Sequence, residues 1–444
     1  MFSSLSSPNY RLYFWGQLVS VSGTWMQTVA QSFLVLQLTD SGTDLGLATA
    51  ARFVPIFLLG PWGGLVADRL DKRRVLYVTQ SLSGVLALVF GVLVGTHAIQ
   101  MWMVYLLAVA LGFVNVFDNP ARQSLIPELV SRPLVRNAVT LNSVTVNMAR
   151  IFGAALGGGI ASLVGLALCF DINAASFAAV VVSLALMSAD QMQRSDREPR
   201  APGQIRAGLR YVRTEPELLV PLLMISIIGA LAWEFPISLP LVARSVFYGG
   251  AGTYGAMTAV MGAGAVVGGL ITASRKRARR RGLAIAAIGW GAAITAAAFA
   301  PTMPLEYAAL VFVGYGSISF NSLAKTALQL SAAPAMRGWV MSLWAVAWLG
   351  STPVGGPIVG WMGEEFGARW SLIVGGIPTI AVGILAYPVL ARIDRRRSGG
   401  SAETAAEVQA EAVMPADAVA PADAVAPGGA VAPAGAVVPG AGTL

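Results

Sequence analysis

Residues 64–74, which read GLVADRLDKRR, form a charged turn between two long apolar segments at about 45–67 and 75–95. Each segment supplies the roughly 20 residues that an α-helix needs to cross a bilayer. Gly64 allows a helix end to pack closely, and Asp68 can compensate the positive N-terminus of a neighbouring helix. The cations that follow can pair with nearby carboxylates. The stretch therefore predicts a hairpin that gates one face of a bundle of membrane-spanning helices.

Apolar segments of this length recur along the chain to about residue 397. Of the 444 residues, 56% are hydrophobic and only 12% are charged, whereas soluble domains carry about 25% charged residues. Spans are predicted at about 12–36, 45–67, 75–95, 101–118, 138–162, 166–188, 218–241, 252–273, 283–300, 305–324, 340–361 and 370–391. Backbone groups in lipid must be hydrogen-bonded within their own segment, so each span is expected to be helical. The predicted fold class is an all-α integral membrane protein with twelve transmembrane helices in two pseudo-symmetric six-helix bundles.

Most of the 30 Lys and Arg fall in alternate connections between the spans. By the positive-inside rule, this pattern places both termini and the central linker in the cytoplasm. The net charge of +8 follows from the same pattern, so no nucleic-acid partner is expected.

Residue counts exclude most catalytic chemistry. One cysteine, Cys169, cannot form an internal disulfide, and one histidine, His97, cannot form a histidine cluster. A phosphate-binding loop, a nucleophile elbow and an H-E-x-x-H zinc motif are also missing from the sequence. The sequence therefore predicts no cofactor, no metal site and no enzyme.

The two halves of the chain repeat each other at separations of 197 to 205 residues. The matching pairs are Gly64 with Gly269, Asn119 with Asn321, Arg136 with Arg337, and Gly153 with Gly350. Such an offset indicates one six-helix unit duplicated in parallel. The predicted domains are an N-terminal six-helix bundle (1–189), a cytoplasmic amphipathic linker (190–217), a C-terminal six-helix bundle (218–397) and a disordered Ala/Pro-rich cytoplasmic tail (398–444).

The linker carries an apolar face flanked by arginines. Anchoring on the inner leaflet is expected, with the apolar side chains in the membrane and the cations at anionic lipid headgroups. The apolar face consists of Ile205, Leu209 and Val212, and the cations are Arg206, Arg210 and Arg213.

Residues 64–74 resemble the loop signature G-x-x-x-D-R-x-G-R-K/R of the major facilitator superfamily, with Asp71 in place of the second glycine. Residues 117–123, 244–250 and 337–343 resemble its enterobactin-exporter-like branch. The resemblance covers about residues 5–395 and implies secondary-active export of small amphiphilic molecules, usually against protons. Two departures are Gly153-Ala154 in place of the antiporter Gly-Pro pair, and a first span without a carboxylate.

Polar side chains inside spans are functional candidates because they are costly in lipid. Two spans carry such residues at intervals of three and four, which is one helical face. Either stripe can line a substrate cavity or make hydrogen bonds between helices; the cavity is favoured for the first span, and the two readings are even for the fifth. The stripes are Gln17, Ser20, Thr24, Gln27 and Gln31, and Thr140, Ser143, Asn147 and Arg150. The predicted substrate cavity comprises Gln17, Thr24, Gln27, Gln31, Asn115, Arg150, Trp233 and Asn321.

Proton coupling needs a carboxylate inside a span, where apolar surroundings favour its neutral form. The candidates are Glu234, Asp118 and Asp171. A structural ion pair is the alternative for Glu234, and Asp118 is expected to serve chiefly as a gate partner of Lys72 or Arg73. For Trp339, Trp344 and Trp348, packing is favoured over stacking on a substrate. The predicted gate comprises Gly64, Asp68, Arg69, Lys72, Arg73, Asp118 and Arg122.

The leading functional interpretation is a proton-coupled exporter of a drug, siderophore or secondary metabolite that works by alternating access. It is expected to be a monomer in the bacterial inner membrane, with a small-molecule substrate, the proton gradient and membrane lipids as partners. A lipid or lysolipid flippase and an uncoupled facilitator are alternatives on the same fold. A non-transporting receptor or scaffold is the alternative from a different class, although it would need neither the gate nor the polar stripe.

Overall fold

The computed structural model describes residues 2–188, 190, 192, 210–274, 280–333 and 336–413. Side chains are not described at positions 61, 64–69, 273–274, 349 and 396–413. Every regular element in the described ranges is a helix, so the all-α prediction is confirmed. The N-terminal half comprises α1 (Pro8–Thr39), α2 (Gly42–Arg69), α3 (Lys72–Gly95), α4 (Met101–Leu125), α5 (Val135–Leu163) and α6 (Leu166–Leu186).

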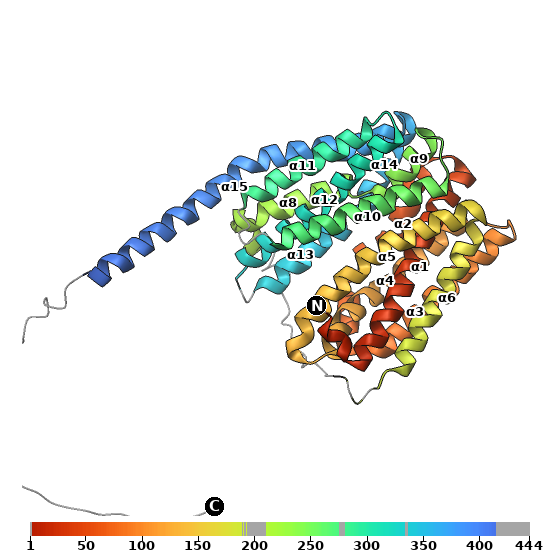
Figure 1. Ribbon diagram of the computed structural model, residues 1–444, viewed down its shortest axis with the longest axis horizontal. Helices are drawn as coiled ribbons and strands as arrows, with labels where there is room; N and C mark the ends of the chain where they lie inside the picture. The colour runs from red at the N-terminus through yellow and green to blue at the C-terminus, as the bar shows by residue number, and fades with distance from the viewer. Residues whose placement is uncertain are drawn as a thin grey trace, which may run out of the picture. The chain divides into compact units, whose positions relative to one another are not determined.

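The C-terminal half comprises α8 (Pro216–Ala232), α9 (Phe235–Ser245), α10 (Ala251–Ser274), α11 (Arg281–Ala298), α12 (Met303–Ser331), α13 (Arg337–Leu349), α14 (Thr352–Glu365) and α15 (Ala368–Val413). Three short 3-10 helices lie at Ser3–Ser6, Ile126–Leu129 and Arg132–Leu134. In Figure 1, α1 to α6 lie together, and α8 and α10 to α14 form a second group beside them.

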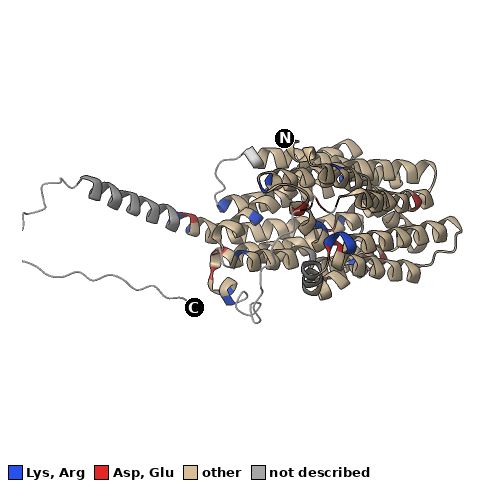
Figure 2. Ribbon diagram, turned by 90° about the horizontal axis from the view of Figure 1, so that it is seen from below, with Lys and Arg blue, Asp and Glu red and all other residues tan. Residues whose placement is uncertain are grey.

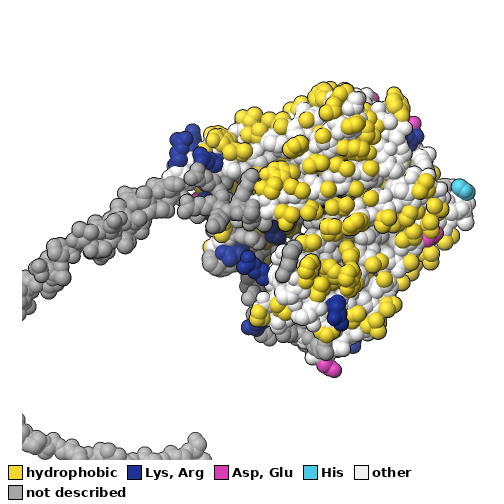
Figure 3. Space-filling view, in the orientation of Figure 1, with side chains coloured by type: hydrophobic (Ala, Val, Ile, Leu, Met, Phe, Trp, Pro, Cys, Tyr) yellow, Lys and Arg dark blue, Asp and Glu magenta, His cyan; other side chains and the backbone are white. Residues whose placement is uncertain are grey.

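Ten stretches of the described chain are long and apolar enough to cross a membrane. The ten do not include α1, whose composition is diluted by its polar stripe, or α13 and α14, which have 13 and 14 residues. Exposed hydrophobic side chains cover the flanks of the helices, and most of the visible Lys and Arg gather toward one end (Figure 3). This surface is that of a multi-pass membrane protein, because apolar side chains on such a flank face lipid rather than water.

Two predicted spans are each broken into two helices. The span predicted at 218–241 divides into α8 and α9 around Trp233 and Glu234, and the span predicted at 340–361 divides into α13 and α14 around Gly350 and Ser351. Proline stands in the first turn of both second helices, where its fixed φ suits a helix start. The first of these spans is still one apolar stretch long enough to cross a membrane, Pro216–Ser245, and the helix break lies within it.

The two halves meet along tightly packed seams. A Cβ at Gly46 of α2 would lie 2.4 Å from the carbonyl oxygen of Gly356 in α14, and one at Gly158 of α5 would lie 2.9 Å from the Cα of Gly255 in α10. These seams lie toward one end of the bundle, here called the opposite face, which carries the α1–α2, α9–α10 and α14–α15 connections. The other end, here called the basic face, carries the α2–α3, α4–α5 and α12–α13 connections.

Met1–Asp394 form one compact unit, and Arg395–Leu444 form a second. The division into two six-helix bundles stays a prediction. Of the predicted linker face, Val212 is buried in the protein core rather than exposed to lipid, and Tyr211 accepts a hydrogen bond from the amide of Ala333 at 3.1 Å. Ile205, Arg206 and Leu209 lie outside the described residues.

The predicted disordered tail begins with helix, since α15 continues to Val413. The physical reason is local composition: residues 402–413 are mostly Ala and Glu, which are strong helix formers. Residues 414–444 lie outside the described part of the chain.

Candidate functional site

The loop between α2 and α3 is held within the N-terminal half. Lys72 forms an ion pair with Glu128 of the 3-10 helix after α4. Arg73 donates to the carbonyl oxygens of Leu184 and Ala185 at the end of α6, at 2.7 and 3.0 Å. Of the other predicted gate residues, the side chains of Gly64, Asp68 and Arg69 are outside the described set.

Asp71 has a specific role at the position where the family signature carries glycine. Its carboxylate accepts a hydrogen bond of 3.1 Å from the amide of Arg74 and so caps the N-terminus of α3. An N-cap carboxylate satisfies an unpaired helix amide and complements the helix dipole. The substitution therefore replaces a flexible turn residue with a helix cap.

Asp118 is not the partner of Lys72 or Arg73, and that prediction is wrong. Its carboxylate pairs with Arg122 at 2.9 Å on the same helix and accepts from Thr79 at 2.8 Å and Gln80 at 2.6 Å on α3. Spacing explains the difference, because Arg122 stands one helical turn from Asp118. Asp118 is thus a buried, fully bonded link between α3 and α4.

The polar stripe of α1 is mostly internal to the N-terminal half. Gln17 accepts from Arg122 at 3.4 Å, and Gln27 accepts from Asn173 of α6 at 2.5 Å. Both amides are buried and join helices, which is the alternative to a cavity-lining role. Thr24 is partly exposed, and Gln31 is buried with a side-chain oxygen that accepts no hydrogen bond from the described residues.

The polar stripe of α5 is more exposed. Thr140 and Ser143 are exposed, and Asn147 and Arg150 are partly buried. The first three donate to carbonyl oxygens one turn back in α5, and the Asn147 amide oxygen also accepts a hydrogen bond from Arg150 at 3.3 Å. Their face lies between the seam of α5 with α1 and its seam with α10, on the side of the basic face. This arrangement suits residues that line an opening between the halves.

Arg150 lies at the inner end of that stripe. It stands over the ring of Trp25 at 5.8 Å, and a Cβ on Gly262 of α10 would be 3.7 Å from its Nε atom. Nε has no hydrogen-bond partner among the described residues. Arg150 therefore sits where α1, α5 and the C-terminal half converge.

Glu234 lies at the break between α8 and α9, with its side chain 3% exposed. Its neighbour across the break is the hydroxyl of Thr352 at the start of α14, and Oε1 has no hydrogen-bond partner in the described structure. The two breaks face each other, since a Cβ on Gly229 would lie 3.0 Å from the Ser351 hydroxyl. Broken helices that meet at mid-membrane are a common setting for transporter binding sites.

A cluster of tryptophans surrounds this meeting point and is here called the tryptophan cluster. Trp233 stands 4.1 Å from Trp348 and 5.3 Å from Trp290 between ring centroids, and Trp344 stacks on Trp348 at 6.0 Å. Trp290 is fully buried, and neither its N–H nor that of Trp344 has a described partner. Lys325 lies 5.3 Å over the Trp344 ring. The sequence favoured packing over substrate stacking for Trp344 and Trp348, and it did not identify Trp290.

The other predicted residues lie apart. Asn321 of α12 is partly buried with an unpartnered amide oxygen, and Asn115 of α4 donates to the Leu111 carbonyl at 2.8 Å. Asp171 is exposed on α6, against Gly91 of α3. Charged residues are sparse along the helices as a whole (Figure 2).

A polar latch closes the opposite face. Glu364 of α14 accepts hydrogen bonds from the Ser41 hydroxyl at 2.7 Å and the Thr43 amide at 2.8 Å, so it caps α2 of the other half. Arg244 of α9 donates to the Leu36 carbonyl and pairs with Asp40 at 3.0 Å. Sequence reasoning missed both roles, because neither residue lies inside a span or a polar stripe.

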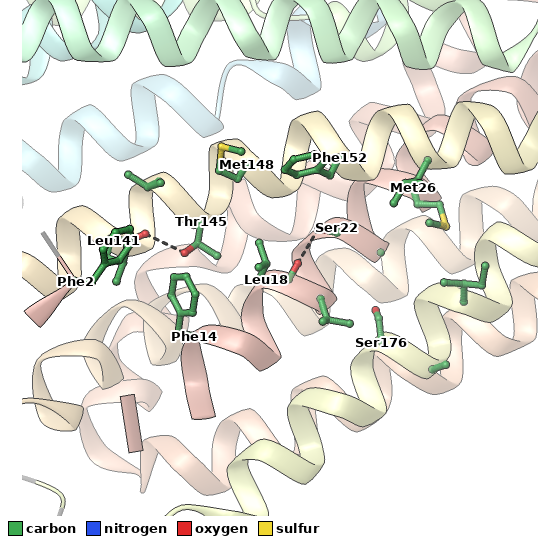
Figure 4. Close-up of a pocket in the computed structure, with 16 residues that line it drawn as sticks. Phe2, Phe14, Leu18, Ser22, Met26, Leu141, Thr145, Met148, Phe152 and Ser176 are labelled. Atoms are coloured by element: carbon green, nitrogen blue, oxygen red, sulfur yellow. Dashed lines mark hydrogen bonds between the residues drawn. The ribbon is translucent and has the colours of Figure 1, made fainter. Parts of the chain in front are cut away.

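An apolar groove of about 740 Å³ runs along α1, α5 and α6 (Figure 4). Its walls include Phe14, Leu18, Met148 and Phe152, with the Thr145 and Ser176 hydroxyls as minor polar elements. Phe152 is also exposed on the flank of the bundle. The groove therefore suits a hydrocarbon chain better than a polar molecule.

Comparison with curated proteins finds transporters of similar length. The staphyloferrin A transporter of Staphylococcus aureus is 23% identical over 383 residues, which are 85% of this chain and 95% of that protein. The multidrug efflux pump Tap of Mycolicibacterium fortuitum is 24% identical and covers 86% and 96%. The enterobactin exporter EntS of Citrobacter koseri is 23% identical and covers 88% and 94%.

A solved bacterial homologue of the iron transporter ferroportin, captured in an inward-facing state, superposes with a TM-score of 0.66 at 16% identity, covering 87% of this chain and 98% of that one. This likeness shows the fold. The family model described as transmembrane secretion effector matches residues 1–415. The protein therefore belongs to the transmembrane secretion effector family of major facilitator transporters.

Proposed function

We propose that this protein is a proton-coupled exporter of a small amphiphilic molecule, with the basic face in the cytoplasm. The observation that carries the proposal is Glu234, a buried carboxylate with an unpartnered oxygen, where two broken helices meet beside the tryptophan cluster. A carboxylate in such surroundings can take up and release a proton as the helices around it rearrange. Similarity to exporters of siderophores and drugs supports a small-molecule substrate.

The places where the halves touch support alternating access. The glycine seams and the latch of Glu364 and Arg244 lie at the opposite face, while Lys72 and Arg73 of the gate loop bond within their own half. Opening the latch and closing the basic face would carry the substrate outward. The prediction that Asp68 belongs to this gate is retained as part of the proposal.

The proposed function is tested by an accumulation screen. Cells with and without the protein are loaded with drugs, siderophores and metabolites, each with and without a protonophore. We expect at least one compound to accumulate less when the protein is present, and the protonophore to abolish that difference. A difference that survives the protonophore would contradict proton coupling, and no difference for any compound would contradict export.

A lipid or lysolipid flippase is the second candidate, and the apolar groove favours it. Phe152 and Leu156 are exposed on the flank and also line the groove, so an acyl chain can enter from the membrane. Proteoliposomes that contain a fluorescent lysolipid distinguish the two functions. Faster transfer of the lysolipid between leaflets than in protein-free liposomes supports the flippase. Equal transfer rates contradict the flippase and favour the exporter.

A further inference from the structure

Two arginines of the N-terminal half lie inside the membrane-spanning part of the molecule without an anionic partner. Among the described side chains, no Asp or Glu forms an ion pair with Arg52 of α2 or Arg150 of α5. A charge in this position is expensive, and it is retained where it meets a counter-ion or a water-filled cavity. Arg150 donates to the Asn147 amide oxygen at 3.3 Å and stands over the Trp25 ring, which are neutral contacts, so water or a ligand can supply the missing anion.

Arg52 faces the interior of the molecule rather than lipid. The exposed apolar residues of α2 form one stripe along the helix, and at 3.6 residues per turn Arg52 falls on the far side from it. The stripe consists of Leu47, Val54, Phe57, Leu58 and Trp62. Arg150 lies at the convergence of α1, α5 and α10 described above. Both guanidinium groups thus belong to the inner side of the N-terminal half.

The acids inside the helices do not pair with either arginine. Asp118 is bonded to Arg122, Thr79 and Gln80. Glu234 beside Thr352 and the buried Glu306 of α12, whose carboxylate oxygens have no hydrogen-bond partner among the described residues, both lie in the C-terminal half. The described interior of the N-terminal half therefore carries uncompensated positive charge. Guanidinium groups bind carboxylates, sulfonates and phosphates through paired hydrogen bonds, so this charge selects an anion.

The C-terminal half offers a complementary surface. Trp344 and Trp348 of the tryptophan cluster are partly exposed and stacked on each other, so their ring faces can receive a flat group, whereas Trp290 is fully buried. Lys325 over Trp344 adds a further cation. Flat π-systems stack on such rings.

From these four observations we infer that the transported molecule is an organic anion with an aromatic or similarly flat group, neutralised by Arg150 and Arg52 and stacked on the tryptophan cluster. The inference rests on the proposed transport function and specifies its substrate class. It separates this protein from exporters of lipophilic cations, because two uncompensated arginines would repel a cation.

Binding of a matched pair of probes to the purified full-length protein in nanodiscs tests the inference. The probes are naphthalene-2-sulfonate and 2-naphthyltrimethylammonium, which share a ring system and differ in charge. We expect the sulfonate to bind and to quench tryptophan fluorescence, and the ammonium ion to bind at least about tenfold more weakly. Equal binding of the two ions, or tighter binding of the ammonium ion, would overturn the inference.

Single-residue variants test whether Arg150 and Arg52 bind the sulfonate group. Arg150→Ala and Arg52→Ala should each weaken sulfonate binding about tenfold or more, Arg150→Lys should restore part of it, and the exposed control Arg11→Ala should leave it unchanged. Thermal unfolding and size-exclusion profiles check that each variant is folded. If Arg150→Ala unfolds, the folded Arg150→Lys variant is measured in its place. Unaltered sulfonate affinity in both Arg150→Lys and Arg52→Ala would then contradict the assignment.

Proteoliposome counterflow with radiolabelled sulfonate separates this inference from the transport function. Binding without counterflow would leave the anion site standing and contradict transport. If the protein carries the ammonium probe in counterflow and added sulfonate does not change that rate, transport is supported and the anion site is contradicted.

Discussion

Glu234 combines burial, an unpartnered oxygen and a position at a helix break. Glu234→Gln keeps the shape of the side chain and imitates its protonated form. We expect this variant to lose export that depends on a proton gradient while it retains downhill exchange of substrate. The measurement is transport into inside-out vesicles with and without an imposed pH gradient.

The control for Glu234 is Glu365→Gln, which neutralises an exposed carboxylate at the end of α14. Glu365→Gln should leave coupling intact. If Glu234→Gln still transports against a gradient with an unaltered pH profile, Glu234 is structural and the coupling proton binds elsewhere.

Glu364 acts at the opposite face, outside the apolar spans. Hydrogen bonds from Thr43, together with those from Ser41, hold the pKa of the Glu364 carboxyl below its usual range. A depressed pKa means that the latch is intact above the ordinary pKa of a glutamate and is lost as the pH falls through the lowered value. Acidification of the opposite face should therefore loosen the latch only at strongly acidic pH.

Glu364→Ala removes the latch at every pH. Two hydrogen bonds to a solvent-exposed carboxylate are worth about 1 kcal/mol after screening, so the population open at this face should rise about fivefold. The measurement is the maleimide labelling rate of Gln31→Cys in a Cys169→Ala background. Glu365→Gln is the matched control on the neighbouring exposed residue, and equal labelling in the Glu364→Ala and control proteins would rule out the latch.

The sequence predicted which residues lie inside spans more readily than it predicted the role of each residue. The sequence identified Glu234 because a carboxylate is rare in a span, and its burial agrees with that expectation. It did not identify Glu364 or Trp290, because hydrogen bonds between halves and ring contacts depend on three-dimensional packing. It misassigned Asp118, although Arg122 one turn away was a local signal for the observed pair.

At the scale of elements, the crossing of α8 and α14 depends on a glycine. A Cβ on Gly355 would lie 1.6 Å from the carbonyl oxygen of Ala230, which is backbone and cannot rotate away. Gly355→Ala must push the two helices apart, and we expect a loss of about 1–3 kcal/mol of stability. Thermal unfolding in detergent measures the effect as a lower melting temperature.

Gly289→Ala in α11 is the control, because a Cβ there would meet no atom within 4 Å. The higher helix propensity of alanine should make this variant equal to or up to about 1 kcal/mol more stable than the parent. A Gly355→Ala protein as stable as the Gly289→Ala protein would show that the crossing is not tightly packed.

Helix boundaries followed from the sequence where hydropathy alone sets them, as for α3 and α6, whereas α4 continues past the predicted end at 118 to Leu125. The breaks in the other two spans did not, because their apolar runs are continuous across the break. Pro236 and Pro353 were the available signal, since proline in the first turn often marks a helix start.

At the scale of the whole molecule, the halves are joined at the opposite face. Ser41→Cys with Glu364→Cys, in the Cys169→Ala background, should be cross-linked by a short bis-methanethiosulfonate reagent, because the native Ser41 Oγ and Glu364 Oε2 atoms are 2.7 Å apart across the halves. Cross-linking should stop transport, and a reducing agent should restore it. Gel mobility measures the cross-link, and each single-cysteine protein is the control.

Full transport by the cross-linked protein would show that the halves do not separate at this face during the cycle. The sequence predicted the bundle and its duplication from hydropathy and spacing. It did not predict which face the halves close, because the contacts that decide this come from glycines and termini that look alike in both halves.

The divided helices make the two halves of the chain mechanically unequal. In the N-terminal half, α1 and α5 run unbroken for 32 and 29 residues, whereas the helices that the predicted repeat matches to them, α8–α9 and α13–α14, are each broken in two. The outer segments α9 and α14 grip α1 and α2 through Arg244 and Glu364, while the inner segments α8 and α13 lie against the tryptophan cluster. The N-terminal half therefore moves on continuous helices, whereas the C-terminal half can bend at its helix breaks. A molecule bound at the breaks would change the position of α9 and α14, and with it the latch of Glu364 and Arg244.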